Sequence, residues 1–124
     1  MRPLHHPRAD ELSLAAVLHA LADPARLAIV RRLAEGGAQS CAGSCAMAEL
    51  PRATLSRHFD VLRGAGLVHT RRLGAQYENR LRTDDLQARF PGLLASILKA
   101  QALDQPAPAP RPRRRAPRRK LVQR

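Results

Sequence analysis

The chain has 124 residues, with 22 basic and 10 acidic side chains and a formal net charge of +12. This length suits one domain, and the positive charge favours a polyanionic partner. Its aromatic side chains are only Phe59, Phe90 and Tyr77, which argues against the base-stacking surfaces that bind single-stranded RNA or DNA. No run of 18 apolar residues predicts a membrane span, and the N-terminus lacks the apolar stretch of a signal peptide. We therefore expect a cytoplasmic protein with reduced cysteines.

The first two predicted elements are an N-terminal arm and a helix. Residues 1–9 are expected to be flexible, and they include the pair His5 and His6. From residue 10 to about residue 21 the apolar side chains recur at helical spacing, namely Leu14, Val17, Leu18 and Leu21.

The next segment carries strong signals for a second helix. Asp23 is a good N-cap and Pro24 suits the first helical position. The helix is predicted to run to about residue 35 and to stop at the two glycines 36 and 37. Its inward side chains are expected to be Leu27, Val30 and Leu33. A short third helix is expected between residues 40 and 50.

The following helix has two chemically different faces. After the turn at Leu50 and Pro51, the apolar residues fall at i, i+4 and i+7 and share one face: Leu55, Phe59 and Leu62. The opposite face mixes short hydrogen-bonding side chains with guanidinium groups: Arg52, Thr54, Ser56 and Arg57. A DNA recognition helix needs this division, although an ordinary amphipathic surface helix also has it.

Beyond the glycines at 64 and 66 the pattern becomes extended. Residues 67–72 and 77–81, with a turn at Gly74 and Ala75, predict a short hairpin. Thr83 is expected to cap a last helical region, and Pro91 should kink or divide it. The second piece carries an apolar stripe of Leu93, Leu94, Ile97 and Leu98.

The C-terminal residues 104–124 contain eight Arg or Lys against Asp104 alone and almost nothing to bury. They are expected to form a disordered basic tail, which leaves residues 10–103 as the folded domain. Such a tail either tracks phosphates without reading sequence or serves only for solubility.

This order of elements predicts a mainly α fold with a small β-hairpin, a winged helix-turn-helix. The third helix would brace the recognition helix. The hairpin, or wing, would place Arg71 and Arg72 against the DNA backbone.

Three stretches also resemble one protein family. LADPARLAIVRRL, TLSRHFDVLRGAGLV and RRLGAQYENRL are similar, in this order, to motifs of the ArsR/SmtB transcriptional repressors. DLQARFPGLL is similar to the C-terminal helix of one branch of that family. The resemblance covers roughly residues 12 to 100.

The resemblance implies a homodimeric repressor that binds a near-palindromic duplex operator. The first and last helices would form the dimer interface, through Leu14, Val17, Leu18, Leu21, Leu93, Leu94, Ile97 and Leu98. A domain this small buries little surface alone, which independently favours a dimer. Base contacts are implied for Arg52, Ala53, Thr54, Ser56 and Arg57; Ala53 stands where Ser is commoner. Arg57 would contact either a guanine or a phosphate.

Family members release DNA when a metal, metalloid or oxidant acts on the dimer, and Cys41 and Cys45 are the candidates here. Their i, i+4 spacing puts both thiols on one face of a helix, and thiolates suit zinc or arsenite. Cys45 matches the last cysteine of the arsenite-responsive pattern, whereas Cys41 is offset by one residue and a third cysteine is absent.

Three interpretations of the two cysteines stay open. The cysteines could be small buried apolar residues, they could form a redox or metalloid sensor, or they could form a metal site that His5 and His6 complete. The family's other metal site, on the last helix, is absent, because Asp84 and Asp85 have no histidine beside them in sequence.

Two other classes of protein are compatible with the same sequence. A nucleic-acid-coating protein built on a winged helix is the rival, with an inducer-independent DNA-binding regulator as a milder variant. An enzyme is not expected, because no carboxylate pair, Ser/His/Asp set or Gly-rich phosphate loop stands out.

Overall fold

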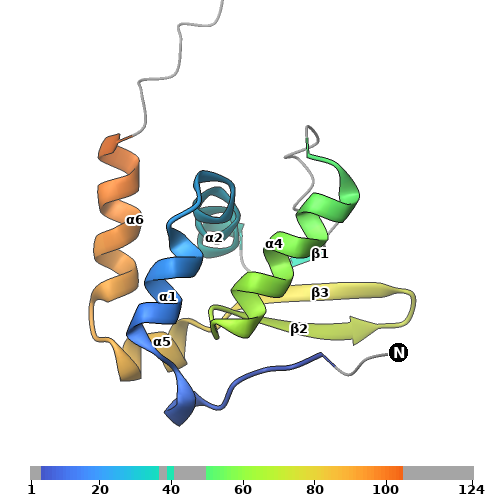
Figure 1. Ribbon diagram of the computed structural model, residues 1–124, viewed down its shortest axis with the longest axis horizontal. Coiled ribbons are helices and arrows are strands. Elements are labelled where there is room, and N and C mark those ends of the chain that lie inside the picture. Colours follow the sequence, from blue (N-terminus) through green and yellow to red (C-terminus); the bar gives the residue numbers. More distant parts are fainter. Residues whose placement is uncertain (1–3, 37–38, 41–49, 105–124) are drawn as a thin grey trace, which may run out of the picture.

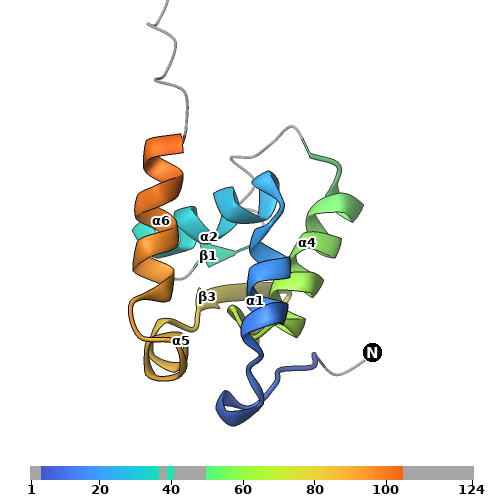
Figure 2. The same ribbon diagram turned by 60° about the vertical axis from the view of Figure 1, so that its left-hand side comes forward.

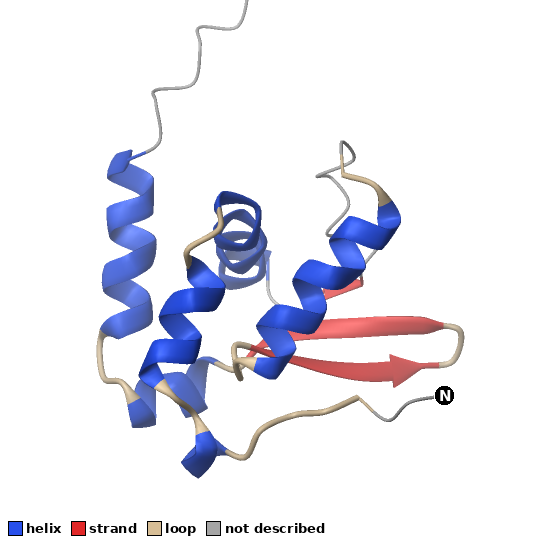
Figure 3. Ribbon diagram, in the orientation of Figure 1, coloured by secondary structure: helices blue, strands red, loops and turns tan. Residues whose placement is uncertain are grey.

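The computed structural model describes residues 4–36, 39–40 and 50–104 of the chain. Helices gather on one side of a small antiparallel sheet, and the sheet extends as a hairpin (Figures 1 and 3). The elements in chain order are η1 (Ala9–Glu11), α1 (Leu14–Leu21), α2 (Pro24–Gly36), β1 (Gln39–Ser40), α4 (Arg52–Gly64), β2 (Val68–Leu73), β3 (Gln76–Leu81), α5 (Thr83–Arg89) and α6 (Leu93–Asp104). This is the expected winged helix-turn-helix. The predicted short helix before Leu50 and the basic tail beyond Asp104 lie outside the described residues.

The first helix begins later than the apolar spacing predicted. Ser13 is the N-cap of α1, and its hydroxyl accepts a hydrogen bond from the backbone N–H of Ala16 at 3.3 Å. The preceding residues form the separate turn η1, in which the Glu11 carboxylate accepts from the backbone N–H of Arg8. The prediction of one helix from residue 10 was therefore wrong, because Ser13 caps the shorter helix locally.

The second helix begins as predicted. The Asp23 carboxylate accepts hydrogen bonds from the backbone N–H groups of Ala25 at 2.8 Å and Arg26 at 3.3 Å. It thereby satisfies donors that the first helical turn leaves unpaired. Val30 and Leu33 are buried, Leu27 is half-buried, and Ile29 is an additional core residue at 1% exposure.

The sheet has three strands, in the order β1-β3-β2. The predicted hairpin is confirmed: β2 and β3 pair from Val68 opposite Leu81 to Leu73 opposite Gln76. Gly74 has a φ of 60° in the connecting turn, a conformation that glycine adopts without strain. Strand β1 was not predicted, because two residues are too short to show an alternating pattern.

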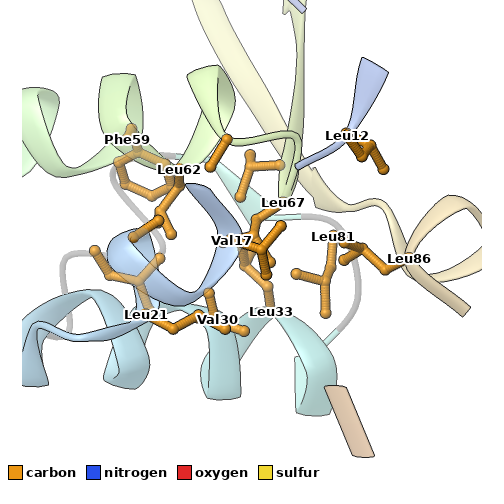
Figure 4. Packing of buried hydrophobic residues seen from close by; sticks show 14 of the residues in the cluster. Leu12, Val17, Leu21, Val30, Leu33, Phe59, Leu62, Leu67, Leu81 and Leu86 are labelled. Carbon is orange, nitrogen blue, oxygen red and sulfur yellow. The ribbon is translucent and has the colours of Figure 1, made fainter. Parts of the chain in front are cut away.

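The core lies between the helices and the base of the hairpin (Figure 4). Phe59 and Leu62 of α4 are almost fully buried there, as are Leu67 and Val68 at the start of the hairpin. Val17 and Leu21 of α1 also belong to this core, at 1% and 5% exposure. These two are core residues rather than the interface residues that the stripe suggested, because the single chain already removes them from solvent.

The C-terminal helical region consists of two pieces, as Pro91 predicted. Helix α5 ends at Arg89, Gly92 has a φ of 77°, and α6 stands beside α1 and α2 (Figure 2). The prediction that Thr83 caps α5 was wrong: Thr83 is the first helical residue, and Arg82 precedes it without a side-chain capping bond. Arg82 instead pairs with the Asp85 carboxylate at 3.0 Å.

Among the residues that the structure describes, no helix is both long and apolar enough to cross a membrane.

Candidate nucleic-acid interface

Helix α4 turns the predicted recognition residues away from the core. Leu55, Phe59 and Leu62 anchor its buried face, each at 2% exposure or less. The exposed residues of the opposite face are Arg52, Ala53, Ser56 and Arg57, and Thr54 is half-buried beside them. The structure thus brings the predicted base-contacting residues onto one outer face. Guanidinium and hydroxyl groups on an open helix face can donate to phosphates and to base edges.

The two wing arginines lie on opposite faces of the hairpin. Side chains alternate along a strand, and Thr70, which precedes Arg72 by two residues, is buried on the helix side. Arg72 therefore shares the helix side with Thr70, opposite Tyr77 on β3. Arg71 points the other way and pairs with Glu78 at 3.1 Å. Of the two wing arginines, Arg72 is therefore the one that lies on the side of the wing that α4 occupies.

Helix α4 is held against α2 by Arg26. The Arg26 Nε donates to the carbonyl oxygen of Ala20 at 2.6 Å, and its Nη1 lies 3.4 Å from Nδ1 of His58 on α4. Asp23 lies at the start of the same helix. Burial raises the pKa of its carboxyl. The hydrogen bonds from the N–H groups of Arg26 and Ala25, together with nearby positive charge, lower this pKa by more, so the net shift is downward. The ionised Asp23 and Arg26 therefore define the corner between α1 and α2, next to the recognition helix.

A second connection joins α4 to the wing. Arg63 in the last turn of α4 pairs with Asp60 at 2.7 Å, and its Nε donates to the hydroxyl of Thr70 at 3.1 Å. The Thr70 hydroxyl in turn donates to Oδ1 of Asn79 at 2.7 Å. Sequence reasoning missed these residues. The alternation along each strand could have indicated them: Thr70 lies two residues after Val68 and Asn79 two before Leu81, so both polar side chains share the inward face with apolar ones.

The N-terminal segment runs along the outer edge of β2 (Figure 1). The backbone N–H of Thr70 donates to Nε2 of His6 at 3.0 Å, and the His6 ring stacks on His69 with centroids 4.3 Å apart. Farther along, Nη1 of Arg82 donates to the carbonyl oxygen of Pro7 at 2.7 Å. Desolvation by burial, followed by the positive charge of His69 and of nearby arginines, lowers the pKa of His6 below its usual 6.5. A neutral His6 is consistent with its role as a hydrogen-bond acceptor.

The predicted cysteine site is not placed by the structure. Cys41 and Cys45 lie outside the described residues. Of the two histidines proposed as further ligands, His5 is exposed and His6 already uses Nε2 to accept from Thr70. In the described ranges, no group of three His, Cys, Asp or Glu side chains is arranged to hold a metal ion.

The predicted dimer interface is divided between core and surface. In α1, Leu14 and Leu18 remain 46% and 45% exposed. The stripe on α6 is half-buried and packs on the core: Leu93, Leu94, Ile97 and Leu98. None of the residues of α6 is fully buried. Helix α6 therefore also retains apolar surface.

Known proteins are similar to this chain in sequence and in fold. Residues 21–71 match the family model described as a helix-turn-helix domain. An uncharacterized HTH-type transcriptional regulator of Bacillus subtilis, YceK, is 35% identical over 91 residues, which cover 73% of this chain and 91% of that protein. The crystal structure of the transcriptional repressor BigR from Xylella fastidiosa is 29% identical, with a TM-score of 0.58 over 76% of this chain and 87% of that one. The crystal structure of an ArsR family transcriptional regulator, 20% identical, shares the fold with a TM-score of 0.56 over 80% and 95% of the two chains.

Proposed function

The chain belongs to the ArsR family of winged helix-turn-helix transcriptional regulators, and we propose that it represses transcription by binding a specific duplex operator as a homodimer. Proteins of this family bind double-stranded DNA and are not enzymes. We further propose that a signal acting on Cys41 and Cys45 releases the operator. Either thiol oxidation or a thiophilic ion such as arsenite or zinc is a suitable signal.

The observation that carries the proposal is the outer face of α4. Arg52 and Arg57 are exposed there and form no ion pair within the described part of the chain. An exposed helix face with unpaired guanidinium groups can enter the major groove, where arginine donates to both acceptors of a guanine. A bidentate Arg57 contact would contribute about 1–3 kcal/mol of discrimination between bases. A phosphate contact would add affinity without adding specificity.

The wing supplies a second point of contact. Arg72 and Tyr77 lie opposite one another near the hairpin turn, on the side of α4. Arg72 is exposed, so its guanidinium can approach the phosphates that flank the groove. Arg71 is expected to contribute less, because it lies on the other face of the hairpin, where it pairs with Glu78.

The proposed dimer uses the helices farthest from the wing. The exposed leucines of α1, Leu14 and Leu18, supply apolar surface that a single chain leaves in water. The neighbouring half-buried stripe of α6 continues it. A second copy that covers both helices would present two α4 helices about one duplex turn apart, the spacing of a near-palindromic operator.

The proposed signal site lies between two elements of the DNA-binding unit. Cys41 directly follows strand β1, which pairs with β3 of the wing, and Cys45 precedes Leu50 and helix α4 by a few residues. A chemical change between these two anchors would act on both the wing and the recognition helix. A disulfide requires the Cβ atoms to approach to about 3.8 Å, closer than two residues one helical turn apart normally come. Oxidation, which removes two electrons and two protons from the thiols, would therefore distort a helix that carried them.

The test is fluorescence anisotropy of the reduced protein on the DNA upstream of its own gene. Scrambled duplex competes at about 150 mM salt, which suppresses contacts that depend only on charge. Arsenite, Zn²⁺ and a mild oxidant are then added separately, with Cys41→Ser and Cys45→Ser as matched variants.

Three outcomes can be distinguished. We expect preference for the upstream DNA, loss of that preference on one addition, and resistance to the addition in the serine variants. Preference without any response would identify an inducer-independent regulator whose cysteines are structural. Equal binding to scrambled duplex would instead identify a general nucleic-acid-coating protein.

A further inference from the structure

The connection between α4 and the wing is built from polar groups inside the fold. Thr70 is 3% exposed and Asn79 is 0% exposed, and they are the buried polar side chains of the described residues. The Thr70 hydroxyl donates to Asn79 Oδ1 and accepts from Arg63 Nε, so both of its hydrogen-bonding functions are used. The side chain of Arg63 is itself only 11% exposed.

Hydrophobic side chains would be the simpler choice at these two positions. Val68 and Leu81, next to them on the same face of the hairpin, are fully or almost fully buried. Burying a hydroxyl and an amide costs free energy unless both are paired, and a paired polar cluster often stabilises no more than an apolar one. The cluster instead constrains the relative orientation of the elements that carry it, because hydrogen bonds weaken steeply when their angles change and apolar contacts do not.

The cluster lies close to both of the proposed DNA-contacting arginines, Arg57 on α4 and Arg72 on β2. Arg63 lies six residues beyond Arg57 on α4, about 9 Å along the helix axis. Thr70 lies two residues before Arg72 on the same face of β2, about 7 Å away. A tilt of about 10° at the cluster would therefore displace Arg57 by roughly 1.5 Å, enough to disturb a bidentate hydrogen bond.

We propose that Arg63, Thr70 and Asn79 are positioning residues for DNA binding. They fix the angle between the recognition helix and the wing, so that Arg57 and Arg72 reach the same duplex at the same time. This inference rests on the proposed operator binding and adds the residues that orient its two contact elements. Asn79 is suited to the role because it lies in the central strand, paired in register with both Thr70 and Gln39.

The experiment is a double-mutant cycle between the cluster and the wing contact. Thr70→Val removes the hydroxyl and preserves the β-branched shape, Thr70→Ser retains the hydroxyl, and Arg72→Ala removes the wing guanidinium. The affinity of all variants for the upstream DNA is measured by anisotropy. Their melting temperatures are measured by circular dichroism, so that each is compared while fully folded.

We expect Thr70→Val to weaken operator binding roughly tenfold and Thr70→Ser to restore it to within about twofold of the wild type. Arg72→Ala should weaken binding roughly fivefold in the wild type but less than twofold in Thr70→Val. In Thr70→Val the wing is misoriented, so Arg72 already contributes less to the affinity. If Thr70→Val does not fold, Arg63→Lys replaces it in the same cycle, since it keeps the charge but removes the Nε donor.

If the wild type prefers its operator but the effects of Thr70→Val and Arg72→Ala on affinity simply multiply, this inference is overturned and the proposed function is not. The cluster would then support the fold without orienting the contacts. Equal binding of operator and scrambled duplex by the wild type would overturn the proposed function and this inference with it.

Discussion

Arg26 and His58 join the two helices of the DNA-binding unit across 32 residues of sequence. The Arg26 Nη1 lies 3.4 Å from Nδ1 of His58, and the same guanidinium donates through Nε to the carbonyl oxygen of Ala20 at 2.6 Å. One side chain therefore links the end of α1, the start of α2 and the middle of α4. The link therefore adds a polar contact to the hydrophobic packing of α4.

Replacing Arg26 by Met should destabilise the protein by about 1–3 kcal/mol, because the Ala20 carbonyl oxygen loses its partner while remaining inside the corner. Urea unfolding followed by circular dichroism measures the change. Arg32→Met is the matched control on the same helix, since Arg32 is also half-buried. Equal losses in the two variants would show that the Arg26 bonds are not responsible.

The stability of the protein should fall as the pH decreases below about 6.5, and His6 should contribute to the fall. Its pKa is lowered in the folded state, so the unfolded chain binds the proton more readily and acid favours unfolding. Protonation also removes the acceptor for Thr70 N–H and places a cation among other basic side chains: His69, Arg63, Arg82 and His5.

The measurement is the free energy of unfolding of the wild type and of His6→Ala between pH 7.5 and pH 5. We expect the wild type to be the more stable protein at pH 7.5 and its advantage to shrink toward pH 5. His5→Ala, an exposed neighbour, is the control and should follow the wild-type curve more closely. A constant difference between wild type and His6→Ala across this range would contradict the assignment to His6.

The two wing arginines should differ in their effect on DNA binding. Arg72→Ala should reduce the slope of log affinity against log salt by about 1, the loss of one phosphate contact. Arg71→Ala should change the slope by less, because Arg71 is paired with Glu78 on the other face of the hairpin. The slopes come from anisotropy titrations at several salt concentrations, and a larger effect of Arg71→Ala would reverse the proposed orientation of the wing.

Leu18→Glu should convert the proposed dimer into monomers. Leu18 is 45% exposed in the single chain, so the substitution is tolerated there, but a dimer would have to bury the new charge. Sedimentation velocity measures the oligomeric state. Leu73→Glu, at a similarly exposed position of 47% on the wing, is the control and should leave the dimer intact. A dimeric Leu18→Glu variant would exclude α1 from the interface.

Much of the architecture was predictable because its signals are local. Asp23 and Pro24 define the start of α2, Pro91 separates α5 from α6, and Gly74 forms the hairpin turn. Each of these effects acts through a few neighbouring backbone groups, so a short stretch of sequence suffices. The buried face of α4 was predictable for the same reason, because helical periodicity alone gathers Leu55, Phe59 and Leu62.

Other features depended on which distant segments meet. The periodicity of α1 could not separate Val17, which enters the core, from Leu18, which stays exposed, because both lie near one helix face. Likewise, the adjacent arginines of the wing could be assigned to different sides only after the helices were seen to cover the face of Thr70.

By itself, the sequence determined the start of α2, the hairpin of β2 and β3, the division between α5 and α6, and the residues on the two faces of α4, because periodicity, capping and turn formation act between residues a few positions apart. The tertiary structure decided which leucines remain for a partner, which wing arginine lies beside α4, and that His6 would bond Thr70 across 64 residues. Those outcomes depend on the packing of helices against the sheet, and packing is a property of surfaces assembled from the whole chain.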